Sequence, residues 1–440
     1  FLDIYVSNDF AFDDYLYINR GGGKFEESLQ EYFRHTANFG MGIDYADLNN
    51  DGLNDLFQVD MLPEGNRRQK KLLSGMNYDR HQLSINRGYS AQYMRNMLQL
   101  GNDNGRYDEV GNLVGVSNTD WSWTPLIADF DNDGNKDIFI TNGYVKDVTD
   151  VDFRDYIIEE SRNRNSTFND EVVIEALQAL KGEPTANYLY KNNSDLTFDN
   201  VAQEWGLATS SYSTGAAYGD LDNDGDLDLI VNNLNSASFL YKNNNSKNTF
   251  VQFDISSDQN ALLSMGTQVK AYTNSGVYTV EMNPFRGFQS SISQNLHLGL
   301  GKSKSIDSVQ VIWSDQSFST LYGVEINTRH TLNKSGLSFK TFAKERRRSD
   351  ISFEDVSSNT SLVYEHRESA FVDFKREPLI PHKLSTEGPV SEVTDITGNG
   401  LSDVFIGSPA GQPSYIYLQK SPEDFERIEL IGSIDPETTD

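Results

Sequence analysis

Four nine-residue segments of this chain place oxygen-bearing side chains at their first, third, fifth and ninth positions and glycine at the sixth. The segments are DLNNDGLND from Asp47, DFDNDGNKD from Asp129, DLDNDGDLD from Asp220 and DITGNGLSD from Asp395. Oxygen ligands at such spacing suit a hard cation such as Ca²⁺, which takes about six to eight of them. Because glycine allows the sharp turn that brings the oxygens together, the sequence predicts four calcium-binding loops.

The predicted ligands come from positions one, three, five, seven and nine of each loop, where position seven can offer its backbone carbonyl. The first two loops contribute Asp47, Asn49, Asp51, Leu53 and Asp55, and Asp129, Asp131, Asp133, Asn135 and Asp137. The last two contribute Asp220, Asp222, Asp224, Asp226 and Asp228, and Asp395, Thr397, Asn399, Leu401 and Asp403. A partial fifth copy, FLDIYV at the start of the chain, adds Asp3 as a ninth-position residue.

The four loops differ in their number of carboxylates. Aspartates are most numerous in the loops from Asp129 and Asp220, which we expect to bind the ion best. The loop from Asp47 has Asn49 in place of one carboxylate and is expected to be weaker. The loop from Asp395 keeps only two carboxylates, so its occupancy stays open. A single motif of this kind also occurs in acidic turns, but repetition favours the metal, and we predict about three to five calcium ions.

Strands, and not helices, are expected to follow these loops. An EF-hand would place a bidentate glutamate at position twelve, inside a helix. Here the twelfth positions hold Gln58, Ile140, Val231 and Ile406, within the apolar stretches LFQV, IFIT, LIVN and VFIG. Short apolar and β-branched stretches of this kind are typical of buried strands. The loop therefore resembles the strand-loop-strand calcium site of integrin-like FG-GAP and VCBS repeats, in which the ninth residue closes the cage from the outgoing strand.

A second pattern follows the loops and predicts a β-hairpin in each repeat. Aromatic or aliphatic residues alternate with polar ones around an Asn or Gly turn. The five copies are YLYINRGGGKF from Tyr15, MLQLGNDNGRY from Met97, YLYKNNSDLTF from Tyr188, FLYKNNNSKNTF from Phe239 and YIYLQKSPEDF from Tyr415. With an apolar strand before the loop, one unit has four strands. Repeats of four strands predict an all-β fold and a β-propeller, and an array of β-sandwiches is the alternative.

We expect residues 1–248 to form propeller blades with two helical insertions, near 64–96 and 147–182. The first insertion contains the basic segment RRQKKLL. It is either a surface for an acidic partner or, as we favour, a helical cover that pairs with the acidic body. The second insertion has the spacing of an amphipathic helix, with Val172, Ile174, Leu177 and Leu180 on one face.

Residues 249–336 form a different β-rich segment. Its stretches MGTQVKAYT, RGFQSS, LHLGLG, VQVIWSDQ and VEINTRHTL resemble an ASPIC/UnbV domain, which accompanies VCBS or FG-GAP repeats in cartilage acidic protein and many bacterial surface proteins. After Trp313 the chain has Ser314, Asp315 and Gln316 where that family favours Pro-Asp-Gly. The alternating strands alone predict a small sandwich beside the propeller. Residues 337–352, with KERRRSD, are expected to be a linker, and 353–440 a further, truncated FG-GAP/VCBS repeat region.

Composition narrows the classes of function. With 37 basic and 65 acidic residues the net charge is −28, which argues against nucleic-acid binding because that requires Lys and Arg to neutralise phosphates. There is no cysteine for disulfide or thiolate chemistry, and no apolar stretch long enough to span a membrane. Loops of this kind are commonly tuned to extracellular calcium, so we expect an extracellular or cell-surface location. The family resemblance implies a bacterial outer-membrane or secreted protein, similar to those of Bacteroidota.

The predicted function is a non-enzymatic, calcium-stabilised extracellular binding or adhesion module that recognises a protein or glycan at a cell surface. The six histidines are scattered without the spacing of a catalytic or metal-binding pair, and the sequence predicts no catalytic residue. The alternative is an accessory lipoprotein subunit, or a carbohydrate-active enzyme, of an outer-membrane complex for glycan or nutrient uptake. The residues that would bind the ligand are not identified by the sequence.

Overall fold

A computed structural model describes residues 2–430, apart from 11, 73–77, 164–169, 246, 257–263, 335–336, 338–339, 342–354, 369–370, 378–379, 381–382, 387 and 410–411. The chain divides into two compact units, residues 1–343 and 344–440, and each is described by itself. The regular elements among the described residues are mostly strands, with few helices. Among them, no helix combines the length and the apolar character needed to cross a membrane.

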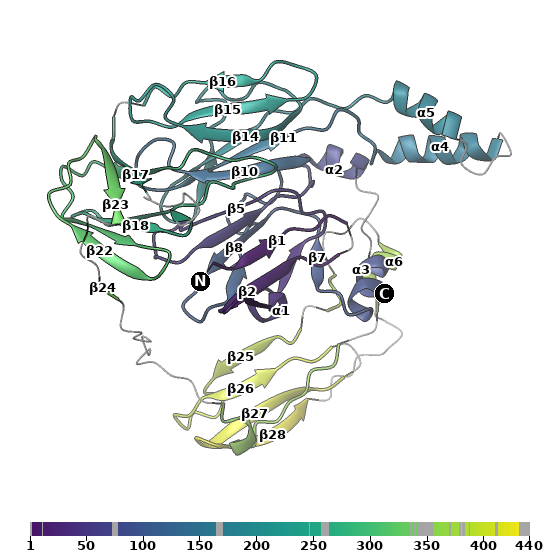
Figure 1. The fold of residues 1–440 in the computed structure, drawn as a ribbon. Coiled ribbons are helices and arrows are strands. Elements are labelled where there is room, and N and C mark those ends of the chain that lie inside the picture. The colour runs from purple at the N-terminus through teal and green to yellow at the C-terminus, as the bar shows by residue number, and fades with distance from the viewer. Residues whose placement is uncertain are drawn as a thin grey trace. The chain divides into compact units, whose positions relative to one another are not determined.

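Four antiparallel sheets follow one another along the first unit (Figure 1). In each sheet the strands lie side by side in the order in which they occur in the chain. We call them the first to fourth repeat sheets. The first contains β1 (Ile4–Val6), β2 (Tyr15–Gly21) and β3 (Lys24–Glu27), and the second β5 (Ile43–Ala46), β6 (Asp55–Gln58), β8 (Met97–Gly101) and β9 (Tyr107–Glu109). The third contains β10 (Ser122–Ala128), β11 (Asp137–Asn142), β12 (Tyr188–Asn192) and β13 (Phe198–Asn200), and the fourth β14 (Ser213–Gly219), β15 (Asp228–Asn233) and β16 (Phe239–Tyr241).

The predicted unit of four strands is present in the second and third repeat sheets, but the hairpin predicted from Phe239 is wrong. Its second half belongs to β17 (Thr249–Ser256), which pairs with β20 (Asn295–Gly301) and β23 (Arg329–Asn333). Val251 and Phe253 of β17 are fully buried in the core of the following domain. Burial of that alternating apolar face therefore outweighs the local hairpin pattern.

Neighbouring repeat sheets pack through apolar side chains, and their first strands β5, β10 and β14 lie in contact in that order. Three side chains recur on one face of the second, third and fourth sheets: the second residue of the calcium loop and a cross-strand pair on the following two strands. In the second and third sheets this face packs against the next sheet. We call these three the next-sheet triad. The triads are Leu48, Phe57 and Leu98 in the second sheet, Phe130, Phe139 and Leu189 in the third, and Leu221, Ile230 and Leu240 in the fourth.

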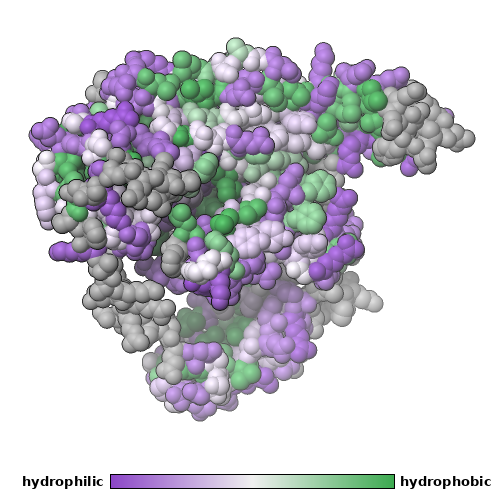
Figure 2. All heavy atoms as spheres, in the orientation of Figure 1, coloured by the Kyte–Doolittle hydropathy of each residue, from purple (hydrophilic) through white to green (hydrophobic). Residues whose placement is uncertain are grey.

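The triads of the second and third sheets are at most 3 % exposed. They lie in the two cores that join the second sheet to the third and the third to the fourth. In the fourth sheet Leu221, Ile230 and Leu240 are 52 %, 42 % and 67 % exposed. Figure 2 shows hydrophobic residues at the surface in the upper part of the view, where β15 and β16 lie. The fourth sheet thus presents, uncovered by any described residue, the same apolar face that its two predecessors bury.

Helices interrupt the second and third repeat sheets, as predicted. The connections contain α2 (Asn66–Leu72) and α3 (Tyr78–Asn86) after β6, and α4 (Val151–Asn163) and α5 (Asp170–Ala179) after β11. The helices α4 and α5 lie side by side and extend away from the sheets (Figure 1). On α5, Ile174 is exposed and Ala176 is buried, so the buried face differs from the predicted one.

The basic segment of the first insertion pairs with acidic residues of its own unit. Arg68 on α2 makes ion pairs with Asp120 and Asp147, and Lys71 Nζ lies 2.9 Å from Asp150 Oδ2. Asp147 and Asp150 precede α4 in the second insertion. These contacts tie the two insertions together, as expected for charges that serve the fold.

Two sheets follow the fourth repeat sheet and enclose one apolar core. The first is β20-β17-β23, and the second contains β19 (Val277–Glu281), β18 (Gln268–Tyr272), β21 (Ser308–Ile312), β22 (Ser317–Leu321) and β24 (Lys340–Thr341). The core includes Phe253, Val269, Leu298 and Trp313. After Trp313, Gln316 adopts a φ of 67°, a conformation that favours glycine. The turn thus forms without the glycine that is favoured in the family this segment resembles.

The remaining elements of the first unit are short. In the first unit, α1 (Leu29–Tyr32) follows β3, and β4 (His35–Ala37) pairs with β7 (Ala91–Tyr93). Of the predicted linker, Lys340–Thr341 forms β24, and residues 342–352 lie outside the described residues.

The second unit contains one repeat sheet, formed by β25 (Ser391–Thr394), β26 (Asp403–Ile406), β27 (Ser414–Ser421) and β28 (Asp424–Leu430). Its other described elements are η3 (Ser357–Asn359) and α6 (Asp373–Arg376).

Candidate metal centres

Each of the four predicted loops joins the first two strands of a repeat sheet and curls around its first aspartate. One carboxylate oxygen of that aspartate accepts the backbone N–H of the glycine at position six. The N···O distances are 3.0 Å for Gly52 to Asp47, 2.8 Å for Gly134 to Asp129, 3.1 Å for Gly225 to Asp220 and 2.8 Å for Gly400 to Asp395. The residue at position five similarly accepts the N–H of position seven in every loop. The loop shape is therefore encoded by short-range hydrogen bonds.

The fourth position of each loop has a defined backbone conformation that was not predicted from the sequence. Its φ angle is positive in Asn50, Asn132, Asn223 and Gly398, as is that of the glycine at position six. Asparagine and glycine are the residues that adopt this conformation most readily, so their presence at position four was an available signal. The Asn50 side chain donates to the Gly134 carbonyl at 3.0 Å, and Asn132 donates to that of Gly225 at 3.0 Å. Position four thus links the loop from Asp47 to that from Asp129, and the loop from Asp129 to that from Asp220.

The aspartate at position nine connects its loop to the third strand of the sheet. Its Oδ2 accepts the N–H of position two in all four loops. Its Oδ1 accepts an N–H from the third strand or from the second residue after it: Gly101 to Asp55 at 2.9 Å, Asn192 to Asp137 at 3.0 Å, Asn243 to Asp228 at 2.8 Å and Gln419 to Asp403 at 2.8 Å. Asp3 accepts from Asn19 in the same way at 2.7 Å. Because each carboxylate oxygen has a second acceptor site, a ligand role remains available.

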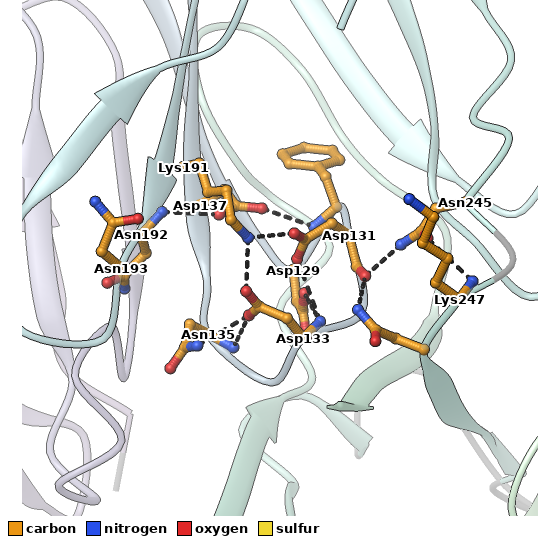
Figure 3. A network of polar contacts seen from close by, with 12 residues as sticks. Asp129, Asp131, Asp133, Asn135, Asp137, Lys191, Asn192, Asn193, Asn245 and Lys247 are labelled. Carbon is orange, nitrogen blue, oxygen red and sulfur yellow. Dashed lines mark hydrogen bonds and ion pairs between the residues drawn. The ribbon is translucent and has the colours of Figure 1, made fainter. Parts of the chain in front are cut away.

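Two of the loops bring three carboxylates close together. Oxygens of Asp129, Asp131 and Asp137 lie within 4.8 Å of one another, as do oxygens of Asp220, Asp222 and Asp224 (the first group in Figure 3). Among the described residues, the loops from Asp47 and Asp395 contain no such group. These are the two loops with fewer carboxylates at positions three and five.

Several aspartates in these loops have a pKa above the ordinary value for this side chain. Burial raises the pKa of Asp129 well above its ordinary value, and the nearby Asp133 and Asp131 raise it further. Burial also raises the pKa of Asp137, with a further contribution from Asp129. In the next loop, burial and the neighbouring Asp224 raise the pKa of Asp226 to about 7. Like charges at close range in a poorly solvated place produce these shifts, and a bound cation would reverse them.

Two buried carboxylate oxygens in the loops have no hydrogen-bond donor. They are Oδ1 of Asp47 and Oδ1 of Asp226, and each residue is only 3 % exposed. A buried carboxylate oxygen without a partner is costly, by about 1–3 kcal/mol or more. Calcium takes carboxylate oxygens among its ligands. The donor set therefore fits a hard divalent cation.

The domain formed by β17–β24 packs directly on the loops from Asp129 and Asp220. A methyl group on Gly299 of β20 would lie 1.9 Å from Asp129 Oδ2 and 2.6 Å from the Asn132 Cα. His297 Nε2 lies 2.5 Å from Asn132 Oδ1, and burial lowers the pKa of this histidine to about 4. Gln252 of β17 donates to Asp220 Oδ2 at 2.8 Å. His297 and Gln252 thus connect this domain to the two loops through hydrogen bonds.

Two family descriptions match parts of the chain. Residues 257–338 match ASPIC and UnbV, and residues 1–57 and 169–231 match the FG-GAP-like repeat. The chain contains FG-GAP-like repeats and an ASPIC and UnbV domain. The resemblance stated from the sequence is thereby confirmed. The matched repeats include the loops from Asp47 and Asp220, and no curated protein matches the chain.

FG-GAP repeat domains are typically extracellular or surface-associated. Together with the ASPIC and UnbV domain they suggest an extracellular repeat protein of a binding type. In this chain the LHLGLG motif of the ASPIC and UnbV domain provides the strand that approaches the loop from Asp129. Gly299 permits that approach because it has no Cβ.

Replacing Gly299 with alanine is expected to lower the free energy of unfolding of the first unit by about 1–3 kcal/mol, because the methyl group must displace Asp129 or the loop backbone. Thermal unfolding followed by circular dichroism measures the change. Gly276→Ala is the matched control in the same domain, since a methyl group there meets only Tyr278 at 3.9 Å. Equal stability of the two variants would contradict the close packing.

Proposed function

We propose that this protein is a non-enzymatic, calcium-stabilised extracellular binding or adhesion module that recognises a protein or glycan at a bacterial cell surface. The observation that carries the calcium role is the recurrence of the loop with buried, unpartnered oxygens in Asp47 and Asp226. The ions would be held by the residues at positions one, three, five, seven and nine, most completely in the loops from Asp129 and Asp220. Bound there, calcium supplies the positive charge that clustered carboxylates lack.

We further propose that the repeat sheets are blades of a β-propeller. Support comes from the side-by-side packing of the first strands β5, β10 and β14, which is how successive blades meet. The exposed triad of Leu221, Ile230 and Leu240 adds a second argument. Its two counterparts are buried under the next sheet, so a further blade of FG-GAP type is the partner that this face fits.

A cleft beside the loops supports the binding role. It has a volume of about 1030 Å³ and lies between the outer strands of the third and fourth repeat sheets. Asp131 and Asp133 of one loop reach it, together with Lys191, Lys242 and the ring of Trp205. Concave sites with an aromatic ring and a few charged groups are typical of ligand binding.

Calcium titration by isothermal calorimetry, with thermal unfolding in calcium or chelator, tests the proposal. Calcium should bind, and at a concentration one hundred times Kd each site should add about 2.7 kcal/mol of stability. The double variant Asp222→Ala/Asp224→Ala should lose one bound ion and keep its fold, because both side chains are substantially exposed. Asp108→Ala, outside the loops, should behave as wild type.

Absence of calcium binding, together with identical unfolding in calcium and chelator, would overturn the proposal. Cleavage of a glycan by the purified protein would overturn its non-enzymatic part.

A further inference from the structure

Two lysines lie against the candidate metal loops. The Nζ of Lys191 contacts Asp131 and lies 2.6 Å from Asp133 Oδ2 (Figure 3). The Nζ of Lys242 contacts Asp222 and lies 3.3 Å from Asp224 Oδ2. In both cases the aspartates are at positions three and five of the loop. The same contact thus recurs in two successive repeats.

The two lysines hold the same place in their repeats. Leu189 pairs with Phe139 and Leu240 pairs with Ile230, and each lysine stands two residues after that leucine. By the same register, the position in the second sheet is Leu100, because Leu98 pairs with Phe57. In the second unit it is Leu418, because Ile416 pairs with Phe405.

Whether this position holds lysine or leucine correlates with the number of carboxylates at positions three and five of the loop. Positions three and five are both aspartate where the residue is Lys191 or Lys242. In the loop beside Leu100, position three is Asn49, and beside Leu418 the two positions are Thr397 and Asn399. A lysine therefore accompanies a pair of carboxylates and is replaced by leucine where that pair is incomplete. This is the pattern expected if the ammonium group offsets repulsion between two like charges.

We propose that Lys191 and Lys242 act as built-in counter-cations, which neutralise the aspartates at positions three and five when no calcium is bound and compete with calcium for them. This inference rests on the proposed calcium function. The two loops with most carboxylates would otherwise suffer the strongest repulsion without the ion. The lysines let these loops keep their shape at low calcium, and they weaken calcium binding in return.

The effect is larger at Lys191 than at Lys242. The side chain of Lys191 is 25 % exposed, whereas that of Lys242 is 55 % exposed, and solvent screens the more exposed contact. Lys191 Nζ also lies 5.9 Å from the centre of the Trp205 ring, which helps to hold the ammonium group beside the loop.

The test measures calcium affinity and calcium-free stability of Lys191→Met and Lys242→Met. Methionine keeps the length and removes the charge. We expect Lys191→Met to bind calcium about tenfold more tightly, which corresponds to about 1.4 kcal/mol, with a smaller gain for Lys242→Met. In chelator, both variants should unfold at lower temperature than wild type. Lys302→Met is the control, because that lysine lines the same cleft but, among the described residues, donates to the Lys247 carbonyl and to no aspartate.

Unchanged or weaker calcium affinity in both lysine variants would overturn the inference, provided that wild type binds calcium. Failure of wild type to bind calcium is a different outcome, because it overturns the proposed function itself. If Lys191→Met does not fold, Lys242→Met still tests the inference, because its side chain is more exposed.

Discussion

Replacing Arg286 with methionine is expected to lower the free energy of unfolding of the first unit by about 3–5 kcal/mol, because it leaves a buried charge without its partner. The Arg286 side chain is 6 % exposed and makes an ion pair with Asp44, whose side chain is fully buried. Its Nη2 lies 2.7 Å from Asp44 Oδ2 and donates to the Ile127 carbonyl at 3.0 Å. Methionine has a similar length but cannot supply either contact.

The position of this ion pair explains the size of the effect. Arg286 belongs to the ASPIC and UnbV domain, whereas Asp44 is on β5 and Ile127 is on β10, so one side chain joins the domain to two repeat sheets. Asp44 also accepts the N–H groups of Ile127 at 2.6 Å and of Tyr45 at 2.8 Å. Burial raises the pKa of Asp44 even though Arg286 opposes that shift. Without the arginine, the carboxyl group would have to become neutral or remain unpaired.

Denaturant unfolding followed by tryptophan fluorescence measures this effect, since all four tryptophans lie in the first unit. The matched control is Arg329→Met, which removes an arginine of the same domain. Arg329 is 46 % exposed where it pairs with Asp254, and an exposed pair contributes about 0–1 kcal/mol. A loss as small in Arg286→Met as in the control would show that the buried pair does not hold the domain in place.

Replacing Leu189 with alanine is expected to cost about 2–5 kcal/mol, whereas the same change at Leu240 should stay within about 0.5 kcal/mol. The two leucines occupy equivalent positions in the third and fourth repeat sheets. Leu189 lies in the core between these sheets, and its loss leaves a cavity. Leu240 is exposed, and its removal leaves none.

The same fluorescence-detected unfolding compares the two leucine variants with wild type. Because both variants replace leucine with alanine, the difference between their losses of unfolding free energy reports how deeply each leucine is buried. A large loss in Leu240→Ala would contradict the exposed face of the fourth sheet and would indicate that another surface covers it in solution.

The local structure of the repeats could be predicted from the sequence because short-range interactions specify it. Spacing of aspartates and glycine over nine residues identified the loops, and the apolar stretches after them identified the strands. The same signals recognised the FG-GAP-like repeats, and ordered motifs recognised the ASPIC and UnbV domain. The positive φ at position four was not predicted, although asparagine and glycine, which adopt it most readily, occupy that position in all four loops. The propeller and the calcium ions stay predictions.

Contacts between distant residues could not be predicted in this way. The hairpin predicted from Phe239 failed because β17 buries Val251 and Phe253 in the next domain. Nothing near Arg286 in the sequence indicates that it would meet Asp44, 242 residues away. The exposure of Leu240 likewise depends on which sheet stands beside it.

The sequence by itself determined where each loop, strand and hairpin signal lies, and which residue types could hold a cation, because these features depend on neighbours within a few residues. Only the tertiary structure decided how the loops are used. It placed β20 against the loop from Asp129 and lysines beside the loops with most carboxylates. It also joined the ninth-position aspartate of each loop to the end of the sheet's third strand. Those outcomes depend on burial, charge and shape at sites that separate parts of the chain create together.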